Sequence, residues 1–278
     1  AADRHYQAAL PLFRAIQARL GEANCQKALG DLALRQADLA AADRHYQAAL
    51  PLFRAIQARL GEANCQKALG DLALRQADLA AADRHYQAAL PLFRAIQARL
   101  GEANCLQSLG RLLLARNEPA AAFGRFLDVL AVFQEIRSSL GEQAAFGYLA
   151  RTVATAGHVD QALALAERSR QIGRAIDDRF GQLINLELQT SLLGNAEEME
   201  AALAAALLHQ QLAVAIQDQN KIERYRPWLE QVRQEIPADV WEQFEQNAEA
   251  LLAQAAAAAE QRLGGRDPLV WVESIIPQ

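Results

Sequence analysis

The sequence AADRHYQAALPLFRAIQARLGEANC occurs three times in this chain, beginning at Ala1, at Ala41 and at Ala81. The copies follow one another at a constant interval of forty residues. An active site needs different residues that converge on one point, whereas identical residues at a constant interval repeat the same contacts with their neighbours. Such a period is typical of arrays in which small structural units stack and share a continuous core. The sequence therefore predicts a repeat protein.

The first half of one period has the pattern of an amphipathic α-helix. Cys25, Ala28, Leu29 and Leu32 are spaced three, one and three residues apart, so they share one face of a helix. Polar side chains recur at the same spacing on the opposite face. This half of the period is therefore predicted to be one helix of about four turns.

The second half of the period predicts another helix, with signals at both ends. Asp38 can cap its start by accepting a hydrogen bond from a free backbone N–H. An apolar stripe then runs from Ala42 through Tyr46 to Leu60. Gly61 follows the stripe, and glycine commonly follows the last residue of a helix. We therefore expect the second helix to run to Leu60.

The composition agrees with closely packed helices and argues against nucleic-acid-binding and membrane-spanning proteins. The chain is 52% hydrophobic with 6% aromatic residues and many alanines, and strand patterns are nearly absent. Residues 1–120 carry a net charge of about +4 and residues 121–278 about −9, with both signs interleaved, so we expect no nucleic-acid partner. No apolar run is long enough to span a membrane. We expect a cytoplasmic protein and, since its only methionine is Met199, a piece of a longer one.

The chemistry-bearing residues recur singly, one per period. Cys25, Cys65 and Cys105 would lie about 8–10 Å apart in stacked helices, too far for a disulfide, so we expect reduced core thiols. The histidines of successive periods would likewise lie in separate layers. No phosphate loop, nucleophile motif or paired-cysteine motif is present. We therefore expect no enzyme activity, no cofactor and no metal.

The spacing within the helix pair resembles the tetratricopeptide repeat. Leu29-Gly30 on the first helix, with Ala42 and Tyr46 on the second, matches the Leu-Gly and Ala-x-x-x-aromatic elements of that family. The later copies at residues 69–86 and 109–126 match in the same way. Small residues at Gly30 and Ala42 would let the two helices approach closely. Gln26 and Ala33 depart from the family pattern, and the forty-residue period is similar to that of kinesin light chains, Leu-Gly-Asn-rich adaptors and bacterial signalling arrays.

The resemblance implies an all-α protein, a right-handed α-solenoid of antiparallel helix pairs. Its expected organisation is a repeat array over residues 1–220, a divergent capping helix pair over residues 221–263 and a tail over residues 264–278. Within the array the expected blocks are a half repeat, 1–20, and the full repeats 21–60, 61–100, 101–140, 141–180 and 181–220. The tail is expected to fold back on the cap or to dock elsewhere.

The resemblance also implies a binding groove lined by the polar face of the first helices. The candidate residues are Asn24, Lys27, Asp31, Arg35, Asn64, Lys67, Asp71, Arg75, Asn104, Gln107 and Arg111. They could hold the backbone and acidic side chains of an extended peptide. Alternatively, Lys27, Asp31 and Arg35 form an ordinary ladder of charges four residues apart that neutralises itself. Asp31 would repel a terminal carboxylate, which argues against a chaperone-tail adaptor.

The sequence predicts a protein-interaction scaffold that binds a peptide or a protein partner. One alternative is the ligand-sensing arm of a larger bacterial signalling or immune protein with an NTPase or caspase-like effector. Another is an engineered or amplified array with a purely structural role, because identity between the copies is complete over residues 1–105. The oligomeric state stays open.

Overall fold

The computed structural model describes residues 2–264 and 268–269, and within these residues the only regular secondary structure is helical. The chain divides into two compact units, Ala1–Glu118 and Pro119–Gln278, which we call unit 1 and unit 2. Side chains of residues 2 and 3 lie outside the description. None of the described helices has the length and apolar character needed to cross a membrane.

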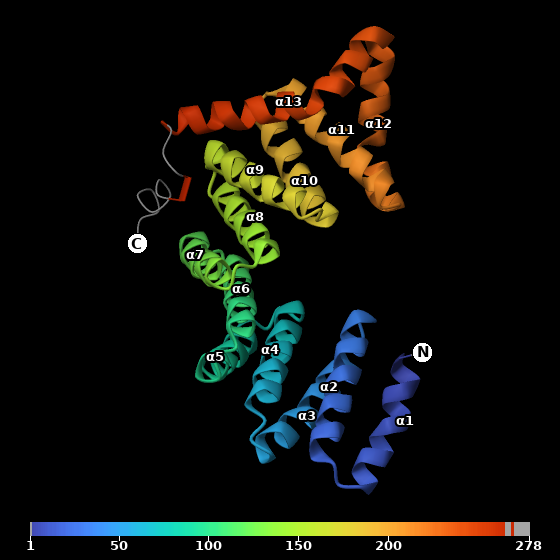
Figure 1. Cartoon of the computed structure of the whole chain (residues 1–278), viewed down its shortest axis with the longest axis vertical. Helices are drawn as coiled ribbons and strands as arrows, with labels where there is room; N and C mark the ends of the chain where they lie inside the picture. Colours follow the sequence, from blue (N-terminus) through green and yellow to red (C-terminus); the bar gives the residue numbers. More distant parts are fainter. Residues whose placement is uncertain (1, 265–267, 270–278) are drawn as a thin grey trace. The chain divides into compact units, whose positions relative to one another are not determined.

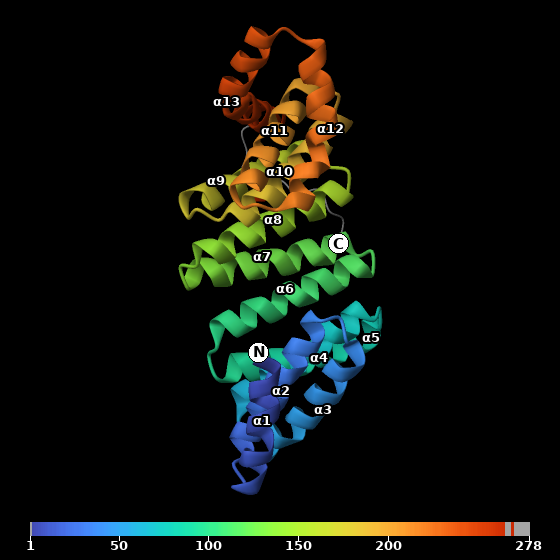
Figure 2. The same cartoon turned by 90° about the vertical axis from the view of Figure 1, so that its right-hand side faces the viewer.

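Unit 1 is a stack of antiparallel helices that alternate between a first and a second type (Figures 1 and 2). Its helices are α1 (Ala2–Ala15), α2 (Arg19–Arg35), α3 (Leu39–Ala55), α4 (Arg59–Arg75), α5 (Leu79–Ala95) and α6 (Arg99–Ala115). Each second-type helix packs against the first-type helices before and after it, as α3 packs against α2 and α4. The expected all-α fold of paired helices is confirmed.

Unit 2 continues the same alternation and ends with a longer helix. Its helices are α7 (Pro119–Glu135), α8 (Ser139–Thr155), α9 (Val159–Ala175), α10 (Arg179–Asn195), α11 (Met199–Ala215), α12 (Gln219–Glu235) and α13 (Ala238–Arg262). Two expectations from the sequence stay predictions. They are the boundaries of the repeat blocks and a capping role for residues 221–263. Of the expected tail, only Gly264, Pro268 and Leu269 are described, and the rest lies outside the described residues.

The second helix of each period ends earlier than the sequence predicted. Helix α3 stops at Ala55, and the next helix has already begun at Arg59, so Leu60 and Gly61 belong to α4. The turn is made by Gln57, which has a positive φ of 54°. Gly61 is therefore not the cap; its missing side chain instead leaves room for the ring of Phe53, because a Cβ there would lie 2.3 Å from Cδ1 of that ring.

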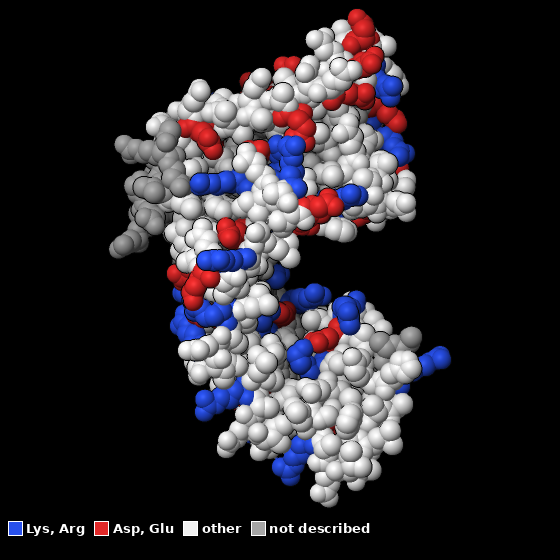
Figure 3. All heavy atoms as spheres, in the orientation of Figure 1, with Lys and Arg blue, Asp and Glu red and all other residues white. Residues whose placement is uncertain are grey.

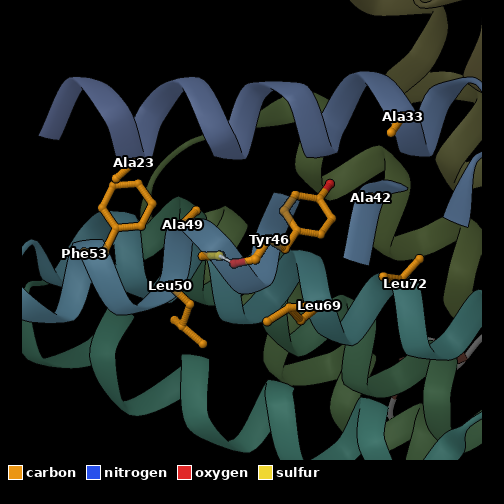
Figure 4. Close-up of a cluster of buried hydrophobic side chains, with 10 residues drawn as sticks. Ala23, Ala33, Ala42, Tyr46, Ala49, Leu50, Phe53, Leu69 and Leu72 are labelled. Atoms are coloured by element: carbon orange, nitrogen blue, oxygen red, sulfur yellow. Dashed lines mark hydrogen bonds between the residues drawn. The ribbon is translucent and has the colours of Figure 1, made fainter. Parts of the chain in front are cut away.

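A second glycine in each period gives the two helices of a pair their close contact. A Cβ on Gly30 would lie 2.6 Å from Cε1 of Tyr46, so the tyrosine ring packs directly on the α2 backbone. The predicted role of Gly30 is thus confirmed. Figure 4 shows the rings of Tyr46 and Phe53 pointing from α3 toward the helix that carries Ala23. These aromatic side chains are fully or almost fully buried and form the centre of each layer.

Two further expectations from the sequence are confirmed. Asp38 caps α3, because its Oδ1 accepts a hydrogen bond from the backbone N–H of Ala41 at 2.9 Å. Cys25, Cys65 and Cys105 are buried free thiols. The Cys65 thiol donates to the backbone carbonyl of Tyr46 at 3.3 Å, and burial raises its pKa to about 12. The cysteines are therefore protonated core residues.

Helix α13 differs from the second helix of an ordinary pair. It packs mainly against α11 and α9 and not as the antiparallel partner of α12 (Figures 1 and 2). Ion pairs hold it there: Arg170 on α9 donates to Glu249 at 2.7 Å, and Arg262 donates to Asp160 at 2.7 Å. As a result, α9 and α11 are buried on faces that α3 and α5 leave open to solvent.

Candidate functional site

The candidate residues chosen from the sequence lie on the first-type helices of unit 1. Helix α2 contacts α4, and α4 contacts α6, so three equivalent polar faces lie next to one another. We call this surface the first-helix face. It is made of Asn24, Lys27, Asp31 and Arg35 on α2, Asn64, Lys67, Asp71 and Arg75 on α4, and Asn104, Gln107 and Arg111 on α6.

Lysine and aspartate on this face are already paired with each other. Lys27 Nζ donates to Asp31 Oδ2 at 2.7 Å, and Lys67 Nζ donates to Asp71 Oδ2 at 2.8 Å. This is the lysine–aspartate part of the charge ladder that the sequence left as an alternative, with Arg35 outside it, and both lysines are therefore bound to a carboxylate. Pairs of this kind on partly exposed helix faces contribute a few tenths of a kcal/mol.

The same aspartates also bind the tyrosines of the neighbouring helices. Tyr46 donates its hydroxyl to Asp31 at 2.8 Å, and Tyr86 donates to Asp71 at 2.8 Å. Burial, followed by the nearby Asp31 carboxylate, raises the pKa of Tyr46 far above its usual range, so the phenol remains a hydrogen-bond donor. The sequence had placed Tyr46 only in the apolar stripe. Its polar partner required knowledge of how the helices cross.

The arginines of the first-helix face are exposed, and the described residues supply no acidic partner for them. This holds for Arg35, Arg75 and Arg111. In α6, Arg111 stands one period after Asp71, so a cation replaces the carboxylate of the two preceding layers. Asp71 is further held by Ser108, whose hydroxyl donates to it at 3.1 Å. The available positive charge on this face therefore comes from arginine.

A hollow with a volume of about 600 Å³ opens between α2 and α4. Asn24, Lys27 and Asn64 line it together with the exposed leucines Leu20 and Leu60. The sequence had assigned Leu60 to the buried stripe of the second helix, so this apolar part of the surface was missed. The signal was present, since each leucine lies four residues before an asparagine and therefore on the same helix face.

The electrostatic character of unit 1 is mixed. Figure 3 shows basic and acidic side chains lying next to each other over α2 and α4, with no large area of a single sign. The second-type helices contribute further pairs across the turns, such as Arg54 to Glu62 at 2.8 Å. The glutamates in the first turns of α2, α4 and α6 are therefore paired with arginine, and they also lie near the N-terminus of their own helix.

The histidines of successive periods are bound inside separate helix pairs. His45 Nδ1 lies 2.7 Å from Gln26 Oε1, and His85 Nδ1 lies 2.7 Å from Gln66 Oε1. Burial lowers the pKa of His85, which favours the neutral ring. Among the described residues, no group of three or more histidine, cysteine, aspartate or glutamate side chains could hold a metal ion.

Unit 2 has a corresponding face that the sequence reasoning did not reach. A hollow of about 500 Å³ is lined by Arg151, Ile184, Glu187, Ser191 and Arg224, among others, on α8, α10 and α12. These five residues lie at multiples of forty from positions of the first-helix face of unit 1, but only Arg151 keeps the residue type found there, at Arg111. Because the later copies diverge in sequence, the repeat pattern did not predict this surface. Glu187 and Arg224 form an ion pair at 2.7 Å within it.

Taken together, the alternating helices and these faces define the class of structure as a helical-repeat solenoid with a tetratricopeptide-like fold. No family model matches the chain, and no curated protein matches it. The solved structures similar to it include BtubC (BKLC) from P. vanneervenii, with a TM-score of 0.67 and 17% identity, covering 78% of this chain and 90% of that one.

Two further similar structures carry the name Rap. The apo form of RapI has a TM-score of 0.65 and 15% identity, covering 91% of this chain and 94% of that one. A Rap protein complexed with Competence and Sporulation Factor has a TM-score of 0.67 and 13% identity, covering 92% of this chain and 74% of that one. At identities this low, the structural similarity shows a shared fold alone.

Proposed function

We propose that this protein is a non-catalytic interaction scaffold that binds an extended peptide segment on the first-helix face of unit 1. The observation that supports it best is the hollow between α2 and α4, where asparagine and leucine side chains lie together. Arg75 and Arg111 are exposed on the same surface. A similar fold in complex with Competence and Sporulation Factor agrees with a binding role for such a solenoid.

Each part of this surface suits a different part of a peptide. The side-chain amides of Asn24 and Asn64 can donate to a backbone carbonyl and accept from a backbone N–H. Leu20 and Leu60 can take up an apolar side chain. The arginine guanidinium groups can bind a carboxylate through two parallel hydrogen bonds. We therefore propose a partner with at least one apolar and one acidic side chain.

The sensing arm of a larger signalling protein is the second candidate function. It is favoured by the same similar structure, in which a Rap protein holds a named factor. Under either function the binding event is the same, and we propose that it takes place in the cytoplasm.

The proposal is tested by selecting peptides on the whole chain from a random peptide display library. We expect enriched peptides that carry an acidic residue and bind Arg75→Glu/Arg111→Glu at least about tenfold more weakly than wild type, because two attractive charges become repulsive. Lys67 is unsuitable for this test. It holds Asp71, and a glutamate there would disturb the Tyr86 hydrogen bond.

The matched control reverses two exposed arginines on second-type helices, Arg44→Glu/Arg84→Glu, which changes the net charge equally. We expect this variant to keep the affinity of the wild type. Equal loss in both double variants would show a general charge effect, and unchanged binding in both would remove the first-helix face of unit 1 from consideration.

A further inference from the structure

The turn that leads into α13 differs from the turns before it. From Gln17 to Gln217, each turn places one residue at a positive φ between 52° and 85°, and these residues recur every twenty positions. Pro237 occupies the next such position. Its ring fixes φ, here at −56°, so the positive φ of the ordinary turn is impossible. Helix α13 therefore does not fold back on α12 and crosses α11 and α9 instead (Figure 1).

This course of α13 leaves a groove between three helices of unit 2. The start of α11, the end of α12 and the first half of α13 border a hollow of about 740 Å³. Its apolar lining includes Met199, Leu203, Trp228, Val232, Val240 and Phe244. Met199 and Val240 are 53% and 47% exposed, and the other four side chains are partly buried. We call this surface the α13 groove, and it is open because α13 does not lie along α12.

The two walls of the α13 groove suit a third helix. On α12, Trp228 and Val232 lie four residues apart, and on α13 Val240 and Phe244 have the same spacing. Apolar stripes of this spacing are the surfaces on which helices pack against each other. An extended segment would bring unpaired backbone N–H and C=O groups against these apolar side chains, whereas a helix satisfies them internally. The shape and lining of the groove therefore favour an amphipathic helix.

The chain around the α13 groove is acidic. From Trp228 to Ala250 it has six acidic residues and one basic residue, Arg233. Of these six, Glu249 alone has an arginine partner among the described residues. Glu200, which lines the groove from α11, likewise has no cation partner there. Figure 3 shows acidic side chains on the part of the surface where α12 and α13 meet. A complementary partner therefore carries positive charge.

We propose that the α13 groove binds an amphipathic helix of a partner protein whose polar face carries lysine or arginine. The apolar face of that helix contacts Trp228 and Phe244, and its cations lie near Glu200 and Glu235. The first-helix face of unit 1 is a separate surface, for which we propose an acidic peptide. Either proposal can therefore fail without the other.

The experiment titrates the full chain with the synthetic peptide KLLKKLLKKLLKKLLK, blocked at both ends, at physiological ionic strength. Calorimetry should show saturable binding, and amide hydrogen exchange should slow within residues 228–250. The control peptide has glutamate in place of every lysine and keeps the same apolar face. We expect it to bind at least about tenfold more weakly, because its charges repel the acidic residues around the groove. Equal binding of the two peptides would overturn the proposal.

The apolar contacts are tested by Met199→Gln/Val240→Gln, which changes no charge. We expect this variant to bind the lysine peptide at least about tenfold more weakly, because two apolar contacts are lost from the groove. The matched control is Leu140→Gln/Val214→Gln, which alters two side chains of unit 2 that are 61% and 55% exposed and lie outside the groove. An equal affinity of both variants would contradict a site in the α13 groove.

The charge contacts are tested by Glu200→Gln/Glu235→Gln, for which we expect binding weakened by about threefold or more. Its control, Glu142→Gln/Glu260→Gln, changes the net charge equally at positions outside the lining of the groove. The same loss in both variants would show a general attraction of the peptide to acidic unit 2 and would exclude a specific site.

Two other occupants would give different results. A dimer in sedimentation equilibrium that Met199→Gln/Val240→Gln converts to a monomer would assign the groove to a second copy of this chain. Binding of the lysine peptide by Trp271→Ser/Ile275→Ser and not by the wild type would assign it to the tail of the same chain. Either result overturns the proposal, as does unchanged amide exchange within residues 228–250 of the wild type at saturating peptide.

Discussion

At the scale of single residues, the packing of this protein depends on glycines that face aromatic rings. Gly70→Ala adds a methyl group 2.5 Å from Cε1 of Tyr86, a distance at which the ring must move. We expect the free energy of unfolding to fall by about 1 to 3 kcal/mol, because a packed core accommodates added volume poorly. Urea unfolding followed by circular dichroism measures this change.

The control for Gly70→Ala is Gly124→Ala. A Cβ on Gly124, in the middle of α7, would meet nothing within 4 Å. Here alanine should raise stability by about 0.5 to 1 kcal/mol through its better helix propensity. The same chemical change is therefore expected to have opposite signs at the two positions. Stabilisation at Gly70 would show that its lack of a side chain is not needed for packing.

His209 on α11 is a buried residue whose charge state should link stability to pH. It is fully buried, lies edge-on to Tyr225 with 5.0 Å between ring centroids, and neither ring nitrogen has a hydrogen-bond partner among the described residues. Burial is the main cause that lowers its pKa to about 4, with Lys221 and Arg224 acting in the same direction and Glu187 and Asp218 opposing. The folded protein therefore holds it neutral.

The sign of the pH effect follows from the two states. The unfolded chain binds a proton at His209 below pH ~6.5, while the folded protein does so only near pH 4, so stability falls as pH decreases between these values. Between pH ~7 and ~5 we expect a loss of about 2 kcal/mol that His209→Leu does not show. Urea unfolding of both proteins at several pH values tests this. Parallel pH profiles would contradict it.

At the scale of helices, α9 and α11 are covered on two sides. The stretch from Ala201 to His209 on α11 is almost continuously buried, and the sequence there is apolar around the whole helix. A helix of that kind is expected to lie inside a structure and not at its surface. Helix α13 provides the second cover.

The ion pairs under α13 are centred on Arg170, which is 2% exposed and donates to Glu167 at 2.8 and 2.9 Å and to Glu249 at 2.7 Å. We expect Arg170→Met to destabilise unit 2 by about 3 to 5 kcal/mol, because it leaves the buried Glu167 carboxylate without a cation. The double variant Arg170→Met/Glu167→Gln should recover much of the loss. Both are measured by urea unfolding.

Arg174→Met is the matched control for this helix. Arg174 binds the same Glu249 at 2.9 Å but is 52% exposed. Its loss should cost less than about 1 kcal/mol, because water screens the pair. A similar cost for Arg170→Met and Arg174→Met would show that burial of the charge does not decide its contribution.

At the scale of the whole molecule, the repeat should tolerate removal of one complete period. Deleting residues 41–80 joins Ala40 to Ala81, which starts the same sequence as Ala41. Each remaining helix of unit 1 then keeps a neighbour of the same type, so we expect unchanged helicity per residue and a lower unfolding midpoint. Circular dichroism and urea unfolding measure both.

Deleting only residues 41–60 removes one helix and places two first-type helices in succession. The rings of Tyr46 and Phe53 are then lost between them, and we expect this variant to lose cooperative unfolding. If both deletions behave alike, the alternation of helix types is not what holds unit 1 together.

Much of the fold could be predicted from the sequence because it depends on local spacing. Apolar residues three and four apart determine a helix face, and Asp38 can cap only a helix that follows it. Gly30 within a helix indicates a neighbouring side chain that packs directly on the backbone. These features recur unchanged in every identical period. The candidate residues share one face of α2, α4 and α6, since helical periodicity alone decides which side chains share a face, and their part in binding stays a prediction.

Features that depend on how helices cross could not be read from the spacing. The turn at Gln57 has a positive φ, which local preference would assign to a glycine, and the packing of Phe53 on Gly61 explains why the chain turns there. Asp31 binds a lysine on its own helix and a tyrosine on the neighbouring helix α3. The sequence by itself determined the helices, their period and their polar faces. Only the tertiary structure decided where the helices end, which charges remain available and that α13 lies across α9 and α11. These three features depend on contacts between residues that are distant in the sequence.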